Sequence, residues 1–127
     1  MAAQRINPPE LPTPLAAYSQ VVKKGSIIAT AGAVALDANG NLVGEGDIQA
    51  QTRQVLENIS AALKAAGATM QDVIKTTVFI SDMSHYKGMN AVYDEFFTEA
   101  PPARSTVKAE LVLPSLLVEI EALAVTG

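Results

Sequence analysis

The chain of 127 residues contains no cysteine and a single histidine. The absence of cysteine excludes a disulfide framework, a thiolate nucleophile and a cysteine-ligated zinc site. A transition-metal site usually takes several His, Cys or carboxylate ligands, so His85 alone makes such a site unexpected. A serine triad would have to use this same histidine. We therefore expect no metal centre.

Clustered positive charge is also missing. The formal net charge is −4, and the nine lysines and arginines are scattered along the chain. A surface that binds the phosphates of a nucleic acid needs a basic patch or stripe, so we do not expect a nucleic-acid partner. Charged residues make up only 17% of the chain and hydrophobic residues 49%. A small monomer has difficulty covering that much apolar surface, which indicates an oligomer.

Long hydrophobic runs are absent from the first 14 residues, which hold four prolines instead. A signal peptide or membrane anchor requires an apolar run, so we expect neither and predict a soluble, cytoplasmic protein. The length predicts one domain, residues 1–127, which buries roughly two thirds of its unfolded surface. Residues 1–14 should form an extended, proline-rich arm of this domain.

The first half of the chain predicts two strands followed by a helix. Residues 18–22 and 27–31 are short apolar segments that should form a hairpin, and Gly32 should end or bulge the second strand. Residues 37–41 are rich in Asn and Gly and indicate a turn. Apolar positions recur every three or four residues over 47–66, which predicts an amphipathic helix. Asp47 should cap its start, and Gly67 should follow its last turn.

The second half predicts strand, helix, strand, strand. Residues 73–80 are rich in β-branched side chains and should form an inner strand, with Ile74, Thr76, Val78 and Ile80 on one side. Ser84 should cap a second helix that prolines 101 and 102 terminate. Residues 103–111 and 117–125 should be the closing strands. This order predicts a two-layer α+β sandwich, a mixed sheet with both helices on one face.

Alternation assigns side chains to the two faces of that sheet. Val118, Ile120, Ala122 and Ala124 should pack under the helices, and Glu119, Glu121 and Leu123 should point the other way. In residues 103–111 one face carries Arg104, Thr106, Lys108 and Glu110. Such a polar set is not expected in a helix-covered core. We therefore expect both Arg104 and Glu119 on the face away from the helices, covered by water or another subunit.

Arg104 and Glu119 are the main candidates for chemistry. A planar guanidinium can hold a substrate carboxylate in two parallel hydrogen bonds, although a surface ion pair is the commoner role of an arginine. Glu119 and Glu121 lie two residues apart on one strand face, where they form either an acid and base pair or a solvated pair. Tyr18 and Asn90 are weaker candidates, because such residues usually serve packing or local hydrogen bonding.

Several segments together resemble the RidA family, formerly called YjgF and also named endoribonuclease L-PSP. The segments are Pro102-Ala103-Arg104-Ser105, Leu113-Pro114, Val118-Glu119-Ile120-Glu121-Ala122, Gly32, the run from Lys75 to Ile80 with Asp82, and Asn90, Tyr93, Phe96 and Phe97. They stand in the family's order and extend over nearly the whole chain.

The resemblance implies a chorismate-mutase-like fold assembled as a homotrimer, with the sheets forming an inner barrel and clefts between subunits. It implies hydrolysis of 2-imino or enamino acids to 2-keto acids and ammonia, with no cofactor. Arg104 then matches the arginine that binds the substrate carboxylate and Glu119 the glutamate that positions or activates water. The other cleft positions match Tyr18, Gly32, Asn90 and Thr106.

Two positions differ from many family members. Thr106 stands where cysteine is common and Ala33 where glutamine is common, and both differences bear on the substrate. Two other functions stay open: a non-enzymatic module that binds a small carboxylate or a protein, and the ribonuclease or translation inhibitor of the older names. The acidic balance of the chain argues against an RNA surface.

Overall fold

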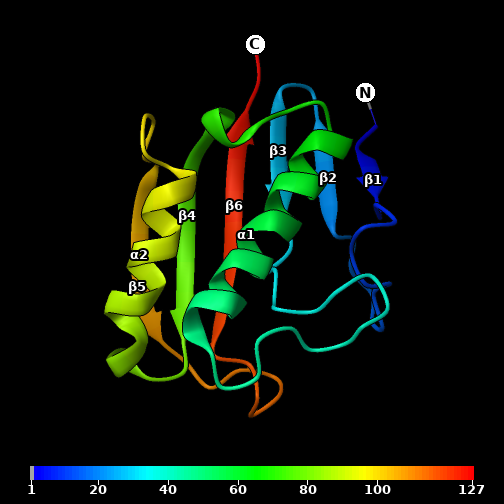
Figure 1. Ribbon diagram of the computed structural model, residues 1–127. Helices are drawn as coiled ribbons and strands as arrows, with labels where there is room; N and C mark the ends of the chain where they lie inside the picture. The colour runs from blue at the N-terminus through cyan, green and yellow to red at the C-terminus, as the bar shows by residue number, and fades with distance from the viewer. Residues whose placement is uncertain (1) are drawn as a thin grey trace.

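Two helices lie on one face of a six-stranded sheet in the computed structural model, which describes residues 2–127 (Figure 1). The helices are α1 (Ile48–Ala65) and α2 (Tyr86–Phe96), and short 3₁₀ helices η1 (Met70–Asp72) and η2 (Met83–His85) precede β4 and α2. The strands are β1 (Gln4–Ile6), β2 (Val21–Lys24), β3 (Ile27–Thr30), β4 (Val73–Ile80), β5 (Ala103–Lys108) and β6 (Val118–Val125). The predicted two-layer α+β architecture is confirmed. Over the described residues no helix is both long enough and apolar enough to cross a bilayer.

The strands lie in the order β1-β2-β3-β6-β4-β5, so β6 is inserted between the N-terminal strands and β4. It pairs antiparallel with both β3 and β4. The pair β4 and β5 is parallel, which makes the sheet mixed as predicted. A parallel pair requires a crossover connection, and α2 provides it. As a result β5 forms the sheet edge beside α2 (Figure 1).

The alternation predicted for β6 is confirmed. Val118, Ile120 and Ala124 have no exposed surface, while Glu119 and Leu123 are partly exposed and Glu121 is exposed. In β4 the alternation is broken by a bulge between Val73 and Lys75. A bulge inserts one extra residue, so Val73 is buried with Thr76 while Ile74 is exposed, contrary to the predicted grouping.

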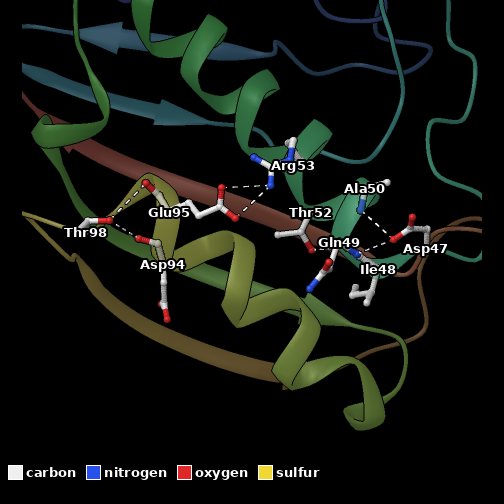
Figure 2. Close-up of polar contacts among 9 residues, drawn as sticks. All are labelled: Asp47, Ile48, Gln49, Ala50, Thr52, Arg53, Asp94, Glu95 and Thr98. Atoms are coloured by element: carbon white, nitrogen blue, oxygen red, sulfur yellow. Dashed lines mark hydrogen bonds and ion pairs between the residues drawn. The ribbon is translucent and has the colours of Figure 1, made fainter.

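Both predicted ends of α1 are confirmed. The Asp47 Oδ1 atom accepts hydrogen bonds from the backbone N–H groups of Gln49 and Ala50, each at 3.1 Å (Figure 2). After the helix, Gly67 has a φ of 83°, the left-handed conformation that favours glycine. The sequence therefore predicts where α1 begins and where it ends. Between these ends the apolar stripe of the helix packs on β3 and β6.

The start of α2 differs from the prediction, because Ser84 does not cap it. Asp82 instead accepts a hydrogen bond from the Ser84 backbone N–H at 2.8 Å and begins η2, and α2 follows at Tyr86. A turn of 3₁₀ helix thus separates the capping side chain from the α-helix. At the far end of α2, Glu95 forms an ion pair of 3.1 Å with Arg53 of α1 (Figure 2).

The N-terminal arm is not simply extended. Its residues Gln4–Ile6 form β1, which pairs with β2, and Leu11 is buried in the core. The Gln20 side chain donates to the Pro12 carbonyl at 2.8 Å, which holds the arm against the start of β2. A three-residue strand is too short to show a period, so sequence pattern missed it. Strand β2 begins only at Val21, which leaves Tyr18 outside the hairpin.

Gln51 fixes the approach to β6. This fully buried side chain donates to the carbonyls of Gly44 at 3.1 Å and Ser115 at 3.0 Å, and its oxygen accepts from the Leu117 N–H at 2.8 Å. One amide therefore joins the first turn of α1 and the loop before it to the segment that precedes β6, more than 60 residues away in sequence. Because Leu117 directly precedes β6, this clamp helps to set the position of the strand that carries Glu119.

Within residues 2–127 no helix covers the second face of the sheet (Figure 1). Ile27 of β3, Val107 of β5 and Val125 of β6 are 54%, 41% and 38% exposed, and Phe79 and Leu123 are partly exposed between them. We call this surface the open face. Its apolar side chains lie among charged ones, with Lys75 donating to Ser105 at 2.9 Å.

Candidate functional site

Arg104 lies on the edge strand β5 with its guanidinium held by α2. Its Nη1 donates to the Asn90 Oδ1 at 2.8 Å and its Nη2 to the Tyr86 hydroxyl at 3.1 Å. The guanidinium carbon also lies 4.7 Å from the centre of the Tyr93 ring, within the range of a cation–π contact. These contacts fix the orientation of the side chain before any ligand binds.

Arg104 lies on the opposite face of the sheet from the one that the sequence predicted. In the register of the sheet Arg104 pairs with Thr76, which is fully buried on the helix side. Arg104 and Thr106 therefore point toward the helices, not away from them. The prediction was wrong because it assumed that a helix offers only apolar atoms to the sheet. At the sheet edge, α2 instead offers the Tyr86 hydroxyl and the Asn90 amide.

Thr106 lies two residues beyond Arg104 on the same side of β5. Its Oγ1 atom is buried, and no hydrogen-bond partner for it exists among the described residues. Burying an unpaired hydroxyl costs on the order of 1 to 3 kcal/mol. Thr106 therefore has an unused donor and acceptor on the same side of β5 as Arg104.

Glu119 and Gly32 form a second group. The half-buried Glu119 carboxylate lies against the α-carbon of Gly32, where a side-chain methyl would come within 2.8 Å of the carboxylate carbon. Burial raises the pKa of Glu119, and the negative charge of Glu121 raises it further. Because its pKa is raised, this carboxyl accepts and releases a proton at a pH nearer to neutral.

Within one chain these two groups lie on opposite faces of the sheet. Arg104 is on the helix side, whereas Glu119, which pairs with Phe79 of β4, is on the open face. Tyr18 joins neither group by a side-chain hydrogen bond, and it is 52% exposed in the loop before β2. Of the six predicted site residues, the chain brings Arg104, Asn90 and Thr106 together, and separately Gly32 and Glu119.

The contacts of Tyr86 and Tyr93 with Arg104 are not evident from the sequence, because both tyrosines stand at the helical spacing typical of an apolar stripe. Tyr86, Asn90 and Tyr93 stand at positions i, i+4 and i+7, so they share one face of α2. A polar asparagine between two tyrosines on such a stripe is the signal that could have revealed the site.

The arrangement around Arg104 suits a small anion. A guanidinium has five N–H donors, and two of them are used by Asn90 and Tyr86. Three donors are left for a ligand, enough for a bidentate contact to a carboxylate. Among residues 2–127 no three His, Asp or Glu side chains gather in a way that could hold a metal ion.

Comparisons with known proteins identify relatives of this chain. The family model described as endoribonuclease L-PSP matches residues 9–126. A RutC family protein from Pyrococcus horikoshii is 46% identical over 113 residues, covering 89% of this chain and 90% of that relative. The 3-aminoacrylate deaminase RutC of Acinetobacter baylyi is 40% identical over 124 residues, covering 98% of each chain.

The fold is shared with a solved structure of the same kind. The crystal structure of the YjgF gene product of E. coli superposes with a TM-score of 0.89 at 36% identity, covering 98% of this chain and 99% of that one. The match thus extends over nearly the whole chain and not over a shared motif alone. The chain belongs to the RidA (YjgF) family, whose model bears the name endoribonuclease L-PSP.

Proposed function

We propose that the protein is a cofactor-independent deaminase that hydrolyses 2-imino or enamino acids, such as 2-aminoacrylate and its tautomer 2-iminopropanoate, to 2-keto acids and ammonia. Water adds to the electrophilic imine carbon, the C–N bond breaks, and ammonia leaves as the C=O bond forms. The protein has to orient the substrate and move protons, and it needs no metal or organic cofactor for either task.

The observation that carries the proposal is the preset guanidinium of Arg104. Its three free donors match a substrate carboxylate, and contacts with Asn90 and Tyr93 hold it in place before binding. The unpaired Thr106 hydroxyl lies on the same side of β5, where it can bond to a polar atom of the substrate. In this proposal Arg104, Asn90 and Thr106 form the substrate-binding half of the site.

Glu119 provides the proton transfer. A general base works best when its pKa is near the working pH, and burial moves the pKa of Glu119 in that direction. Glu119 accepts a proton from the attacking water and returns it to the departing ammonia. Gly32 leaves the space that this carboxylate occupies.

One chain holds these two halves on opposite faces, so a complete site requires a second copy. We propose a homotrimer in which the open face of one subunit packs near the β5 edge of the next. Exposed Ile27, Val107 and Val125 give that face the apolar character of an interface. Tyr18, whose side chain is exposed and forms no hydrogen bond among the described residues, then extends into the cleft of a neighbour.

Similarity to a 3-aminoacrylate deaminase supports an enamino acid as the substrate class. The test is to generate 2-iminopropanoate with a dehydratase and follow ammonia release with the wild type and with Arg104→Ala. We expect release well above the uncatalysed rate with the wild type, and with Arg104→Ala no faster release than without added protein, because losing a buried contact to a charged ligand costs on the order of 2 to 5 kcal/mol. Equal rates would contradict the carboxylate-binding role.

The alternative function is a binding module without catalytic activity. The same two proteins distinguish it from a deaminase. Saturable binding of 2-oxobutanoate by the wild type, lost in Arg104→Ala but unaccompanied by imine turnover, would favour it. Cleavage of RNA that persists through purification and disappears in Arg104→Ala would instead favour the ribonuclease suggested by the name of the family model.

A further inference from the structure

Thr76 and Tyr93 form a buried pair of hydroxyl groups between the sheet and α2. Their side-chain oxygens lie 2.7 Å apart, Thr76 has no exposed surface and Tyr93 is only 4% exposed. Thr76 belongs to β4 and Tyr93 to α2, so this hydrogen bond joins the sheet to the helix that covers its edge. Because both hydroxyls are bonded to each other inside the core, the pair is not itself a ligand-binding group.

A polar pair is not required for stability at this position. Replacing both partners of a buried hydrogen bond by apolar groups of the same shape can be nearly neutral. The neighbours along both elements are apolar, with Val78 of β4 and Met89 of α2 fully buried. Apolar packing is non-directional, so it does not by itself fix how far a helix lies along a strand. A hydrogen bond does, and setting such a register is the best-attested use of buried polar groups.

The register of α2 on the sheet determines how Arg104 is held. Among residues 2–127, three side-chain hydrogen bonds join α2 to the sheet. Arg104 itself donates two of them, to Tyr86 and Asn90. The third, between Thr76 and Tyr93, is the one that does not depend on Arg104.

This third bond lies beside both ends of the arginine. Across β4 and β5, Thr76 is the register partner of Arg104, so the two backbones are adjacent. At the other end, the guanidinium carbon lies 4.7 Å from the centre of the Tyr93 ring. The hydroxyl pair therefore links the strand next to Arg104 with the ring on which its guanidinium lies.

We propose that Thr76 is a positioning residue for the carboxylate site, which it serves by fixing Tyr93 and with it the register of α2 against β5. The inference rests on the proposed function, which places a carboxylate at Arg104. Without the hydroxyl bond α2 can shift along the sheet, and the groups that hold the guanidinium shift with it. The guanidinium is then correctly directed in only a fraction of the molecules, and the apparent Kd rises by the inverse of that fraction.

The test measures Tm and the Kd for 2-oxobutanoate in the wild type, Thr76→Val, Tyr93→Phe and the variant with both substitutions. Each single substitution leaves one buried hydroxyl unpaired, so each should lower the Tm. The double substitution removes both hydroxyls, and its Tm should return close to that of the wild type. We nevertheless expect calorimetric titration to show about tenfold weaker binding in all three variants, the effect of a competent fraction of about one tenth.

Thr76→Ser is the matched control. Serine keeps the hydroxyl and removes a buried methyl group, so this variant should lose stability while the bond to Tyr93 remains. Its Kd for 2-oxobutanoate should stay within about twofold of the wild-type value. The double variant thus keeps stability and loses affinity, whereas Thr76→Ser loses stability and keeps affinity. A purely structural role of Thr76 would not give this pattern.

Three results would overturn the inference. Wild-type affinity in the double variant would show that binding follows stability. A loss of Tm in the double variant equal to the sum of the two single losses would show that the hydroxyls are not paired. Equal weakening of binding by Thr76→Ser and Thr76→Val would assign the effect to packing at this position.

Arg104→Ala separates these results from a failure of the proposed function. In each of the three cases, loss of 2-oxobutanoate binding in Arg104→Ala would leave the carboxylate site standing and remove only the role of Thr76. Unchanged binding by Arg104→Ala would instead remove the carboxylate site, and the role of Thr76 with it.

Discussion

The carboxylate of Glu119 lies over the α-carbon of Gly32, in the space that any side chain at that position would fill. The φ of Gly32 is not in the left-handed region, so its backbone conformation does not require glycine. Glycine is needed there because only a residue without a side chain lets the Glu119 carboxylate lie so close to the backbone. The segment that follows β3 and the start of β6 are thus arranged together to hold a half-buried carboxyl on the open face.

Replacing Gly32 tests this relationship. In Gly32→Ala the added methyl collides with the carboxylate and displaces it. Since a displacement of about 1 Å can cost 100-fold in rate, we expect a fall in kcat of that order with little change in 2-oxobutanoate affinity. Thermal unfolding provides the control. Gly32→Ala should lower the Tm of the wild type but not of Glu119→Ala, where the collision partner is gone.

Arg104→Lys tests whether the two parallel N–H donors of the guanidinium contribute to catalysis beyond its positive charge. Lysine keeps the positive charge but cannot offer two parallel N–H donors or stack on Tyr93 in the same way. We expect kcat/KM for 2-iminopropanoate to fall on the order of 100-fold, measured by coupled keto-acid reduction. Arg53→Lys is the matched control, because Arg53 pairs with Glu95 on the surface. Comparable losses in both variants would show a general effect of the substitution.

Mixing two inactive variants tests whether one site takes residues from two chains. Arg104→Ala and Glu119→Gln should each be nearly inactive alone. After joint unfolding and reassembly in equal amounts, about a quarter of the sites should combine an intact Arg104 with an intact Glu119 from a neighbour. We therefore expect about that fraction of wild-type activity. No recovery, in mixtures shown by native mass spectrometry to contain both chains, would place both residues of a site in the same chain.

The raised pKa of Glu119 predicts how stability depends on pH. Burial, and then Glu121, make the folded chain hold this proton at pH values where the unfolded chain has lost it. The stability contributed by Glu119 is therefore present below its unfolded pKa and is lost as the pH rises through the folded pKa. Glu119→Gln removes that loss, so its Tm relative to the wild type should increase between pH 4 and pH 8. A Tm difference between Glu119→Gln and the wild type that stays constant from pH 4 to pH 8 would contradict a raised pKa of Glu119.

Glu121→Gln tests the second cause of the same shift. Removing this negative charge two residues away should lower the pKa of Glu119 without exposing it. The acidic limb of the kcat/KM profile should then move to lower pH, while the Tm changes little because Glu121 is exposed. If the acidic limb of the profile does not move, burial alone accounts for the raised pKa of Glu119.

Much of the fold follows from local patterns in the sequence. The period of α1, the Asp47 cap and the alternation of β6 each depend on neighbours in sequence, and all three predictions are confirmed. The extra residue in β4 and the short strand β1 depend on pairing with distant strands. Such features leave no period in a single segment, which is why sequence pattern alone did not reveal them.

The site could be predicted only as a set of residue types. The resemblance selected Arg104, Asn90 and Gly32, and the structure brings the first two together. Which side of the sheet Arg104 occupies depends on the parallel register with β4, because pairing with Thr76 turns it toward α2. A register between strands separated by a helix cannot be deduced from alternation within either strand.

The central place of β6 has a consequence for how the protein folds. Strands β1 to β3 and strands β4 and β5 form two separate hydrogen-bonded groups, and only β6 joins them. Residues 118–125 follow all the other strands in the chain, so no earlier stretch can complete the sheet. Pairings this distant in sequence form slowly. During synthesis, Ile28 would therefore lack its partner Ala124, and Val78 its partner Ile120, until β6 is made, and their incompletely covered apolar surface would be open to aggregation and to chaperones in that period.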